Sequence, residues 1–267
     1  MRVSLHHLTL TDLTPEELAT VAAELECDHI CLFIKVPGDN PLSFPRVESV
    51  QQARTLRKHI DTCGISVWNV DTFMILPDMN VSAYHETLEI AAVLGARTIN
   101  AVNFSADPAG AAEALRNFAE IAAPMGLTVV LEWYRFSKTG NLAAALELVR
   151  QVDLPNVKLN VDVLHLIRNG NDPGAVGRVP PALIGYAQIC DGPLSLPIEA
   201  QMHEAVFDRN FPGEGEFPLV SFVESLPVDA VLSIEAPVNR LREALSPRER
   251  AHRAVAGTRR ILAASHR

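Results

Sequence analysis

Four polar residues close four successive apolar segments of this chain, and their types suit a site for a divalent metal ion. The segments are VVLEW, KLNVD, IGYAQ and LSIEA, and the residues are Glu132, Asp162, Gln188 and Glu235. Each segment has the length and composition of a buried β-strand. Carboxylate and amide oxygens at the carboxyl ends of parallel strands can together bind a hard divalent cation.

The alternation of side chains along these segments supports a shared site. Successive side chains of a strand point to opposite faces, so each of the four shares its face with the residue two positions earlier: Val130, Asn160, Tyr186 and Ser233. Any one of the four alone could simply cap its strand. Oxygen donors favour Mn²⁺ or Mg²⁺, with Co²⁺ or Zn²⁺ as substitutes.

Strand-like and helix-like segments alternate along the whole chain. Helix starts are marked by cap-and-proline pairs such as Thr14-Pro15, and helix ends by glycines such as Gly64 and Gly95. This order predicts an α/β fold, a single (β/α)₈ TIM barrel that forms one domain over residues 1–267. An open doubly wound sheet is the alternative, but no glycine-rich phosphate loop follows the first strand. The expected strands are 2–8, 29–34, 65–73, 97–104, 127–134, 157–163, 183–190 and 230–236.

Composition narrows the classes of partner. The 267 residues are 48% hydrophobic, which is enough for a large core, and a net charge of −9 disfavours nucleic acid and anionic membrane surfaces as partners. The four cysteines have neither metal-knuckle nor redox-motif spacing, so we expect reduced thiols in a cytoplasmic protein. The amino-terminal segment is too short and polar for a signal peptide, and the sequence contains no long apolar span.

Five motifs resemble the xylose isomerase-like TIM-barrel superfamily of sugar isomerases and epimerases, over nearly the whole chain. They are LEW at 131–133, DVLH at 162–165, QICDG at 188–192, RNFPGEGEF at 209–217 and SIEAP at 233–237. The resemblance implies a metal-dependent enzyme that removes a proton next to a carbonyl and forms an enediolate. It also implies that the four polar residues at the strand ends bind the metal.

Two positions depart from the pattern of the ketose 3-epimerases in that family. Those enzymes have histidine as the third ligand, where this chain has Gln188, and a second glutamate about six residues after the first ligand, where this chain has Lys138. Bacterial 3-dehydroshikimate dehydratases of the same family resemble this chain better at the third ligand. They also carry a similar arginine followed by a PGxG segment.

Proton removal also needs a base near the metal. His165 lies three residues after Asp162 and would point away from the site on a continuous strand. It reaches the site only where the strand ends near Val163 and the chain turns; otherwise it supports the loop. Lys138 is the second candidate, with a solvated loop lysine as the alternative.

Arg209 precedes a Pro-Gly turn in the loop after the seventh strand, from which it could reach the site. Its planar guanidinium suits a carboxylate or a developing oxyanion. A surface salt bridge with Asp208 or Glu214 is the alternative. The alternation of side chains along its strand points Asp191 away from the barrel interior, so we expect a structural role for it.

Side chains at other strand ends are expected to contact the substrate, a small molecule: His7, Trp68, Asn103 and Tyr134. The favoured function is a divalent-metal-dependent isomerase or epimerase of a keto sugar or related hydroxy-carbonyl compound. A dehydratase of the 3-dehydroshikimate type is the first alternative, and a non-catalytic small-molecule-binding barrel is the second. A DNA-repair endonuclease is disfavoured, because few of the nine histidines lie at expected strand ends. The sequence leaves a homo-oligomer open.

Overall fold

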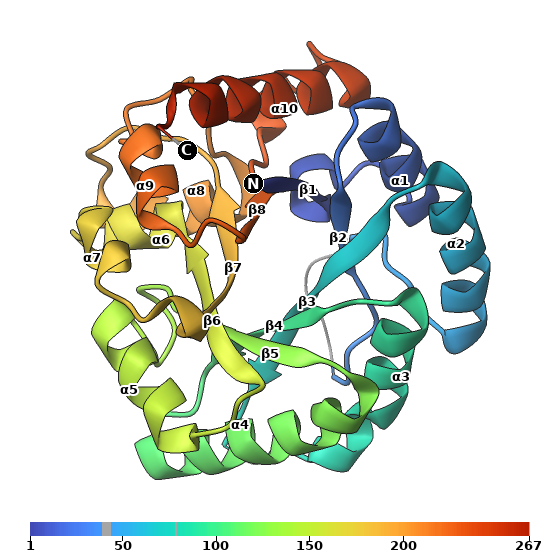
Figure 1. Cartoon of the computed structure of the whole chain (residues 1–267), viewed down its shortest axis with the longest axis vertical. Coiled ribbons are helices and arrows are strands. Elements are labelled where there is room, and N and C mark those ends of the chain that lie inside the picture. Colours follow the sequence, from blue (N-terminus) through green and yellow to red (C-terminus); the bar gives the residue numbers. More distant parts are fainter. Residues whose placement is uncertain (39–43, 78, 267) are drawn as a thin grey trace.

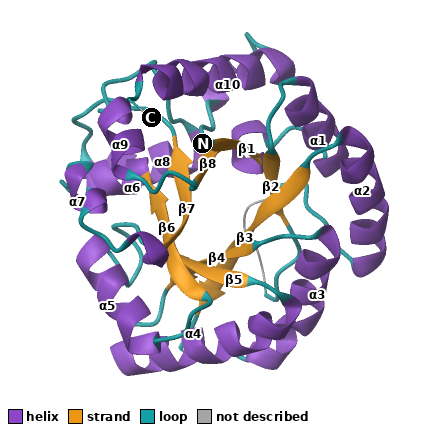
Figure 2. Cartoon of the chain, viewed as in Figure 1, coloured by secondary structure: helices purple, strands orange, loops and turns teal. Residues whose placement is uncertain are grey.

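The protein folds as a single (β/α)₈ TIM barrel, as the sequence predicted. The computed structural model describes residues 1–38, 44–77 and 79–266. Eight parallel strands close in chain order into a barrel, and helices surround it as an outer ring (Figure 1; Figure 2). The strands are β1 (Arg2–His6), β2 (His29–Phe33), β3 (Ser66–Ile75), β4 (Thr98–Asn103), β5 (Thr128–Glu132), β6 (Val157–Asp162), β7 (Ile184–Ile189) and β8 (Val231–Ile234).

The helices begin and end at the signals expected from the sequence. Thr14 and Ser246 form capping boxes at the starts of α1 and α10, each with proline in the first turn. Gly64 ends α2 in the left-handed conformation at φ 72°. The α-helices are α1 (Pro15–Glu24), α2 (Val50–Cys63), α3 (His85–Leu94), α4 (Pro108–Ala122), α5 (Leu142–Val152), α6 (Val163–Arg168), α7 (Gly174–Gly177), α8 (Ile198–Phe207), α9 (Leu219–Ser225) and α10 (Pro247–Ala264).

All eight predicted strands are present, and two of them end at positions that matter for the site. The first strand stops at His6 rather than at residue 8, because the His6 ring accepts a hydrogen bond from Leu8 N and caps the 3₁₀ turn η1 (His7–Leu10). The third strand continues to Ile75, two residues beyond its predicted end. Trp68 is therefore the third residue of a ten-residue strand and not a strand-end residue.

The core has two parts. Most buried apolar side chains pack between the strands and the outer helices. Inside the barrel, Val130, Tyr186 and Val231 form a smaller cluster against which Trp68 packs. The Arg2 guanidinium lies 4.7 Å from the centre of the Trp68 ring, toward the start of the strands. This apolar plug leaves the carboxyl ends of the strands for polar side chains.

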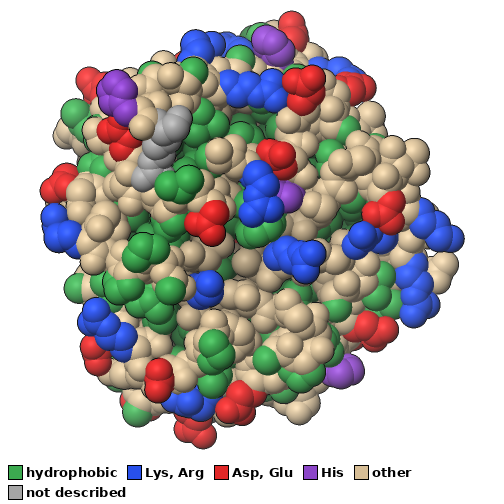
Figure 3. Space-filling model, viewed as in Figure 1, with side chains coloured by type: hydrophobic (Ala, Val, Ile, Leu, Met, Phe, Trp, Pro, Cys, Tyr) green, Lys and Arg blue, Asp and Glu red, His purple; other side chains and the backbone are tan. Residues whose placement is uncertain are grey.

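The surface matches the composition. Lysine and arginine side chains are interspersed with aspartate and glutamate over the face shown in Figure 3. The four cysteines are free thiols, and three of them are buried. None of the helices in the described part of the chain combines the length and apolar character needed to span a bilayer.

Candidate functional site

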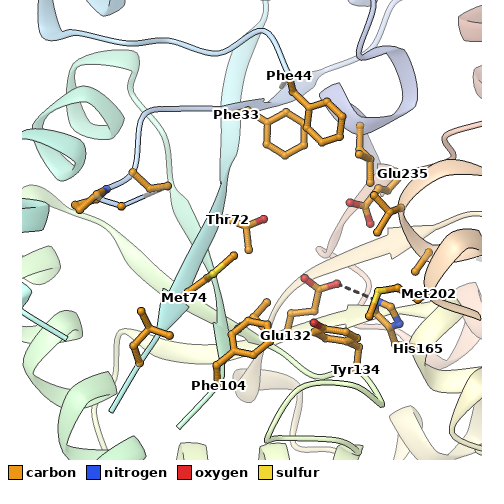
Figure 4. A pocket seen from close by; sticks show the side chains of 18 of the residues that line it. Phe33, Phe44, Thr72, Met74, Phe104, Glu132, Tyr134, His165, Met202 and Glu235 are labelled. Carbon is orange, nitrogen blue, oxygen red and sulfur yellow. Dashed lines mark ion pairs between the residues drawn. The ribbon is translucent and has the colours of Figure 1, made fainter. Parts of the chain in front are cut away.

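A cavity of about 360 Å³ opens at the carboxyl ends of the strands. Its charged and imidazole side chains come from the ends of β5 and β8 and from the segments that follow β6 and β7: Glu132, Glu235, His165 and Arg209. In Figure 4 Glu132, His165 and Tyr134 lie together on one side of the cavity, with Glu235 above them. This is the end of a TIM barrel at which active sites form.

Glu132, Asp162 and His165 converge because β6 ends early. Asp162 is the last residue of β6, and its Oδ1 accepts a hydrogen bond from Leu164 N, which caps α6 directly after the strand. The first turn of α6 brings His165 back over the strand end. His165 Nε2 lies 3.5 Å from Glu132 Oε1 and 3.6 Å from Asp162 Oδ2. The strand ends at Asp162 and the chain then turns, which is the arrangement under which the sequence predicted that His165 would reach the site.

Arg209 is buried among the carboxylates, with only 3% of its surface exposed. Its Nη1 donates to Asp162 Oδ2 at 2.8 Å and to the Glu235 carbonyl oxygen at 3.0 Å. Its Nη2 lies 3.1 Å from Glu235 Oε2. Asp208 and Glu214 pair with other arginines. The surface salt bridge considered for Arg209 is therefore not formed, and Arg209 offsets part of the negative charge of the site.

The loop that carries Arg209 is held by Asp191. Asp191 Oδ1 accepts a hydrogen bond from Phe217 N at 3.0 Å, and Oδ2 accepts one from Gly213 N at 3.0 Å. Gly215 passes so close that a Cβ there would lie 2.6 Å from Gly192 N. Asp191 thus has the structural role that its alternation predicted, and the loop requires glycine for the close approach of two backbones.

The ionisation of the carboxyl groups follows their burial and neighbours. Burial, then the charges of Glu235 and Asp162, raises the pKa of Glu132 well above its usual range. Burial raises the pKa of Glu235 to about 7, although Arg209 and His6 oppose it. Burial also acts to raise the pKa of Asp162, but Arg209 and then His165 outweigh it, and the net shift is downward.

His165 is a neutral imidazole at pH 7. Burial lowers its pKa to about 4, although the charge of Asp162 opposes this effect. The ring is tilted against Tyr134, with 5.4 Å between ring centres. A neutral imidazole keeps a lone pair that can bind a metal ion or accept a proton.

Gln188 takes part in a buried amide network that the sequence did not show. Glu132 Oε2 accepts from Asn100 Nδ2 at 2.6 Å, and Asn100 Oδ1 accepts from Asn160 Nδ2 at 3.2 Å. Asn160 Nδ2 also donates to Gln188 Oε1 at 2.6 Å. When Glu132 is ionised, as metal binding would require, its oxygens only accept, and this fixes the direction of the chain, because reversing any amide would place two acceptors or two donors together. One lone pair of Gln188 Oε1 is thereby used, and its role as a metal ligand stays a prediction.

His6, Cys31 and Asp71 form a second buried group near Glu235; the position of His6 at a strand end was expected from the sequence, but its grouping with Cys31 and Asp71 was not. The alternation of Asn69 and Asp71 along the third strand was the available signal. His6 Nδ1 accepts from Leu8 N at 3.0 Å, so the ring proton is on Nε2, which donates to Asp71 Oδ2. Nε2 therefore has no free lone pair for a metal ion, and the group serves as a hydrogen-bonded support 3.5 Å from Glu235 Oε1.

The predicted substrate contacts separate into two sets. Tyr134 lines the cavity. His7 is buried behind Phe33 and donates to the Leu13 carbonyl, and Trp68 lies in the amino-terminal half of its strand.

Asn103 and Lys138 line a separate cavity of about 180 Å³. Lys138 N donates to the Asn103 carbonyl at 2.8 Å, which ties the loop after β5 to the end of β4. The structure does not bring Lys138 into the group that contains Glu132, because this loop turns outward.

The donor set at the strand ends fits a divalent metal ion. Glu132, Asp162 and His165 each offer one ligand atom, and these atoms lie within 4.8 Å of one another. Two carboxylates and a neutral imidazole suit Mn²⁺, Co²⁺ or Zn²⁺ better than an all-oxygen set would. The Glu235 carboxylate next to Arg209 adds negative charge nearby.

Known proteins resemble the chain chiefly through the fold. A zinc-bound IolI protein superposes with a TM-score of 0.80 at 17% identity, covering 98% of each chain. A D-psicose 3-epimerase with D-tagatose from Clostridium cellulolyticum superposes with 0.75 at 18% identity, covering 98% of this chain and 99% of that one. A xylose isomerase-like TIM barrel/4-hydroxyphenylpyruvate dioxygenase fusion protein superposes with 0.79 at 22% identity. This chain covers 42% of the fusion protein.

Sequence similarity is local for one relative and extensive for the family. A 3-dehydroshikimate dehydratase of Bacillus anthracis is 39% identical over 59 residues, which are 22% of this chain and 21% of that protein. The family model described as xylose isomerase-like TIM barrel matches residues 19–260. The chain therefore belongs to the xylose isomerase-like TIM-barrel family.

Proposed function

We propose that the protein is a divalent-metal-dependent isomerase or epimerase of a small hydroxy-carbonyl compound. The observation that carries the proposal is the convergence of Glu132, Asp162, His165, Arg209 and Glu235 at the mouth of the barrel. Family membership supports it, because the epimerases share this fold. The bound ion would polarise the carbonyl and acidify the neighbouring C–H bond.

Each polar residue then has a distinct part. Glu132, Asp162 and His165 would hold the ion, and their burial excludes competing water. Glu235 lines the cavity, and its carboxylate would take the proton from the carbon next to the carbonyl and return it to the same or a neighbouring carbon. Arg209, fixed by Asp162, would stabilise the negative charge that builds on the substrate oxygen as the enediolate forms.

Deuterium incorporation tests this proposal. Keto sugars and smaller hydroxy-ketones are incubated in D₂O with the protein and Zn²⁺, and NMR detects deuterium on the carbon next to the carbonyl. Glu132→Gln and Glu235→Gln should each abolish the exchange, whereas Glu113→Gln on the exposed face of α4 should not. Exchange that persists in Glu235→Gln would remove Glu235 as the proton carrier.

A dehydratase is the second candidate, supported by the 59-residue match to a 3-dehydroshikimate dehydratase. The first step, proton removal next to a carbonyl, is the same. Loss of the β-hydroxyl then yields a conjugated product, so 3-dehydroshikimate incubated with protein and metal would develop new ultraviolet absorbance. An isomerase or epimerase labels its substrate with deuterium without this absorbance change.

A further inference from the structure

The wall of the cavity is far more apolar than its floor. Twenty residues of the described part of the chain line it, and the charged or imidazole side chains among these are four: Glu132, His165, Arg209 and Glu235. Thr72 adds one hydroxyl and Tyr84 and Tyr134 add phenols, while most of the remaining side chains are hydrocarbon, thioether or phenyl groups. A volume of about 360 Å³ is in the usual range for small-molecule sites.

The two kinds of side chain are separated in space. In Figure 4 Glu132, His165 and Glu235 lie on one side, and Phe33, Phe44, Met74 and Phe104 line the rest of the cavity. Phe33 and Phe44 stack with 5.0 Å between ring centres. Phe104 meets the edge of Tyr134 at 6.2 Å, so aromatic surface continues to the polar side.

Several apolar side chains of this wall are open to solvent. Met74 and Leu76, at the end of β3, have 42% of their surface exposed, and Met202 on α8 has 40%. Large apolar side chains grouped around one concave surface mark a binding site more often than a solvated face. The burial of these side chains is most favourable when a ligand covers them with apolar surface.

A polyhydroxylated chain is poorly matched to this wall. Each carbon of a sugar carries a hydroxyl group, and a buried hydroxyl without a partner is destabilised relative to water. Partners for a few oxygens exist at the polar side of the cavity. Along Phe33, Phe44, Met74 and Phe104 the described side chains offer few partners, chiefly the Thr72 hydroxyl, which lies between Phe33 and Met74 in Figure 4.

We propose that the substrate is a hydroxy-carbonyl compound with an aromatic or branched alkyl group at its other end. The hydroxy-carbonyl end lies against Glu132, His165, Arg209 and Glu235, which rests on the proposed function. The apolar end lies between the Phe33–Phe44 pair and the Met74–Phe104 side, and this part depends only on the cavity wall.

Two probes with the same hydroxymethyl ketone head test the proposal. One is 1-hydroxy-4-phenylbutan-2-one, with a phenyl arm, and the other is L-erythrulose, an open-chain keto sugar. Calorimetric titration of the full chain with Zn²⁺ present should give an affinity at least about tenfold higher for the phenyl probe, as expected for burial of one ring. Equal affinities, or tighter binding of L-erythrulose, would overturn the proposal.

A matched pair of variants locates the phenyl arm. Met74→Gln keeps the length of the side chain and lies on a solvent-exposed position, so the fold should tolerate it. This change should lower the affinity for the phenyl probe roughly fivefold or more and leave the affinity for L-erythrulose unchanged. Val228→Gln, at a site with 77% exposure outside the cavity, should change neither. An unchanged phenyl affinity in Met74→Gln would overturn the placement.

Deuterium exchange on the same probes keeps the two proposals distinguishable. Tight binding of the phenyl probe without exchange at its hydroxymethyl carbon would overturn the proposed function and support the apolar wall as a ligand site. Exchange on L-erythrulose together with weak phenyl binding would overturn the inference and support the function. If a second copy of the chain covers the wall instead, the apparent molecular mass of the protein will rise with its concentration, and Met74→Gln will reduce that mass. This outcome also overturns the inference.

Discussion

At the scale of single residues, Arg209 decides the charge balance of the site. It is buried against Asp162 and Glu235, with hydrogen bonds or ion contacts of 2.8–3.1 Å to both. Arg209→Gln would leave two buried carboxylates without their cation. We expect a loss of about 3–5 kcal/mol in the unfolding free energy of the metal-free protein at pH 7, measured by urea denaturation.

Arg248→Gln is the matched control for Arg209, because Arg248 pairs with Glu24 in a contact that is 61% exposed on the arginine side and lies away from the site. Exposed pairs contribute about 0–1 kcal/mol, so the control should stay close to the wild type. A loss in Arg209→Gln no larger than in Arg248→Gln would show that the carboxylates are neutralised in another way.

His7 makes the stability of the protein depend on pH. Burial lowers the pKa of His7 to about 4 from an unfolded value of 6.5, partly offset by its hydrogen bond to the Leu13 carbonyl. As the pH falls, the unfolded chain therefore takes up a proton on His7 at a higher pH than the folded chain does. Stability from this group is complete above pH 6.5 and is lost as the pH falls toward 4.

The size of the His7 effect is about 3 kcal/mol, at 1.36 kcal/mol for each unit of pKa difference. Urea denaturation at pH 7 and pH 5 should show the wild type losing stability more steeply than His7→Gln, whose amide can still donate to Leu13. Parallel pH profiles for the two proteins would contradict a buried neutral His7.

Residue types and alternation predicted part of the site. Strand periodicity identified Glu132, Asp162 and Glu235, because it fixes which face a residue occupies, and the Pro-Gly turn after the seventh strand pointed to Arg209; the structure brings these four together. Residue types and alternation could not reveal the amide network around Gln188, since three strands must pair in a specific register before Asn100 and Asn160 meet. Strand periodicity does not encode the direction of a loop. The sequence therefore placed Lys138 in the site, whereas the structure places it on a separate cavity.

At the scale of elements, strand ends determine what the site contains. The β6–α6 junction places His165 over Asp162, and its signal was present in the sequence as a loop-rich segment soon after the strand. The extension of β3 to Ile75 had no comparable signal. Trp68 lies in the amino-terminal half of the strand with either set of bounds, and the extension places Met74 within the strand at the mouth.

The loop after β7 is a second element on which the site depends, and Gly215 is its most restricted position. A Cβ at 215 would collide with Asp191 and lie 2.6 Å from the Gly192 backbone. Gly215→Ala should displace the loop that carries Arg209 and lower the unfolding free energy by about 1–3 kcal/mol, measured by urea denaturation.

Gly140→Ala is the control for Gly215, since the nearest atom to a Cβ there is at 3.6 Å, an ordinary contact. We expect its stability to stay within about 0.5 kcal/mol of the wild type. A Gly215→Ala protein as stable as Gly140→Ala would mean that the loop relaxes without strain.

At the scale of the whole molecule, the barrel is the part that the sequence predicted best. Eight apolar segments at regular intervals allow few other arrangements, because parallel strands need helical crossovers and a closed barrel leaves no edge. The segregation of the cavity into polar and apolar sides was not predicted. It arises where the strand residues Phe33 and Met74 meet side chains of loops and of α8, whose positions depend on tertiary packing.

Metal binding is a property of the assembled barrel, because its donors come from different strands and a helix. An ion that binds only the folded state stabilises it by about 2.7 kcal/mol at a concentration of one hundred times Kd. For a chain of this size this raises Tm by roughly 5–10 °C. We expect Mn²⁺ to produce such a shift in the wild type and EDTA to reverse it.

Variants show which residues produce the shift in Tm. Glu132→Gln and His165→Gln should remove it, since each deletes a donor from the group within 4.8 Å, while Glu113→Gln on the surface of α4 should retain it. Gln188→Leu distinguishes two ligand sets: a lost shift supports the amide as a fourth ligand, and a retained shift limits the ligands to Glu132, Asp162 and His165. If no divalent ion changes the Tm of the wild type, the proposed metal site is contradicted. The barrel would then bind its ligand through the buried charged side chains alone.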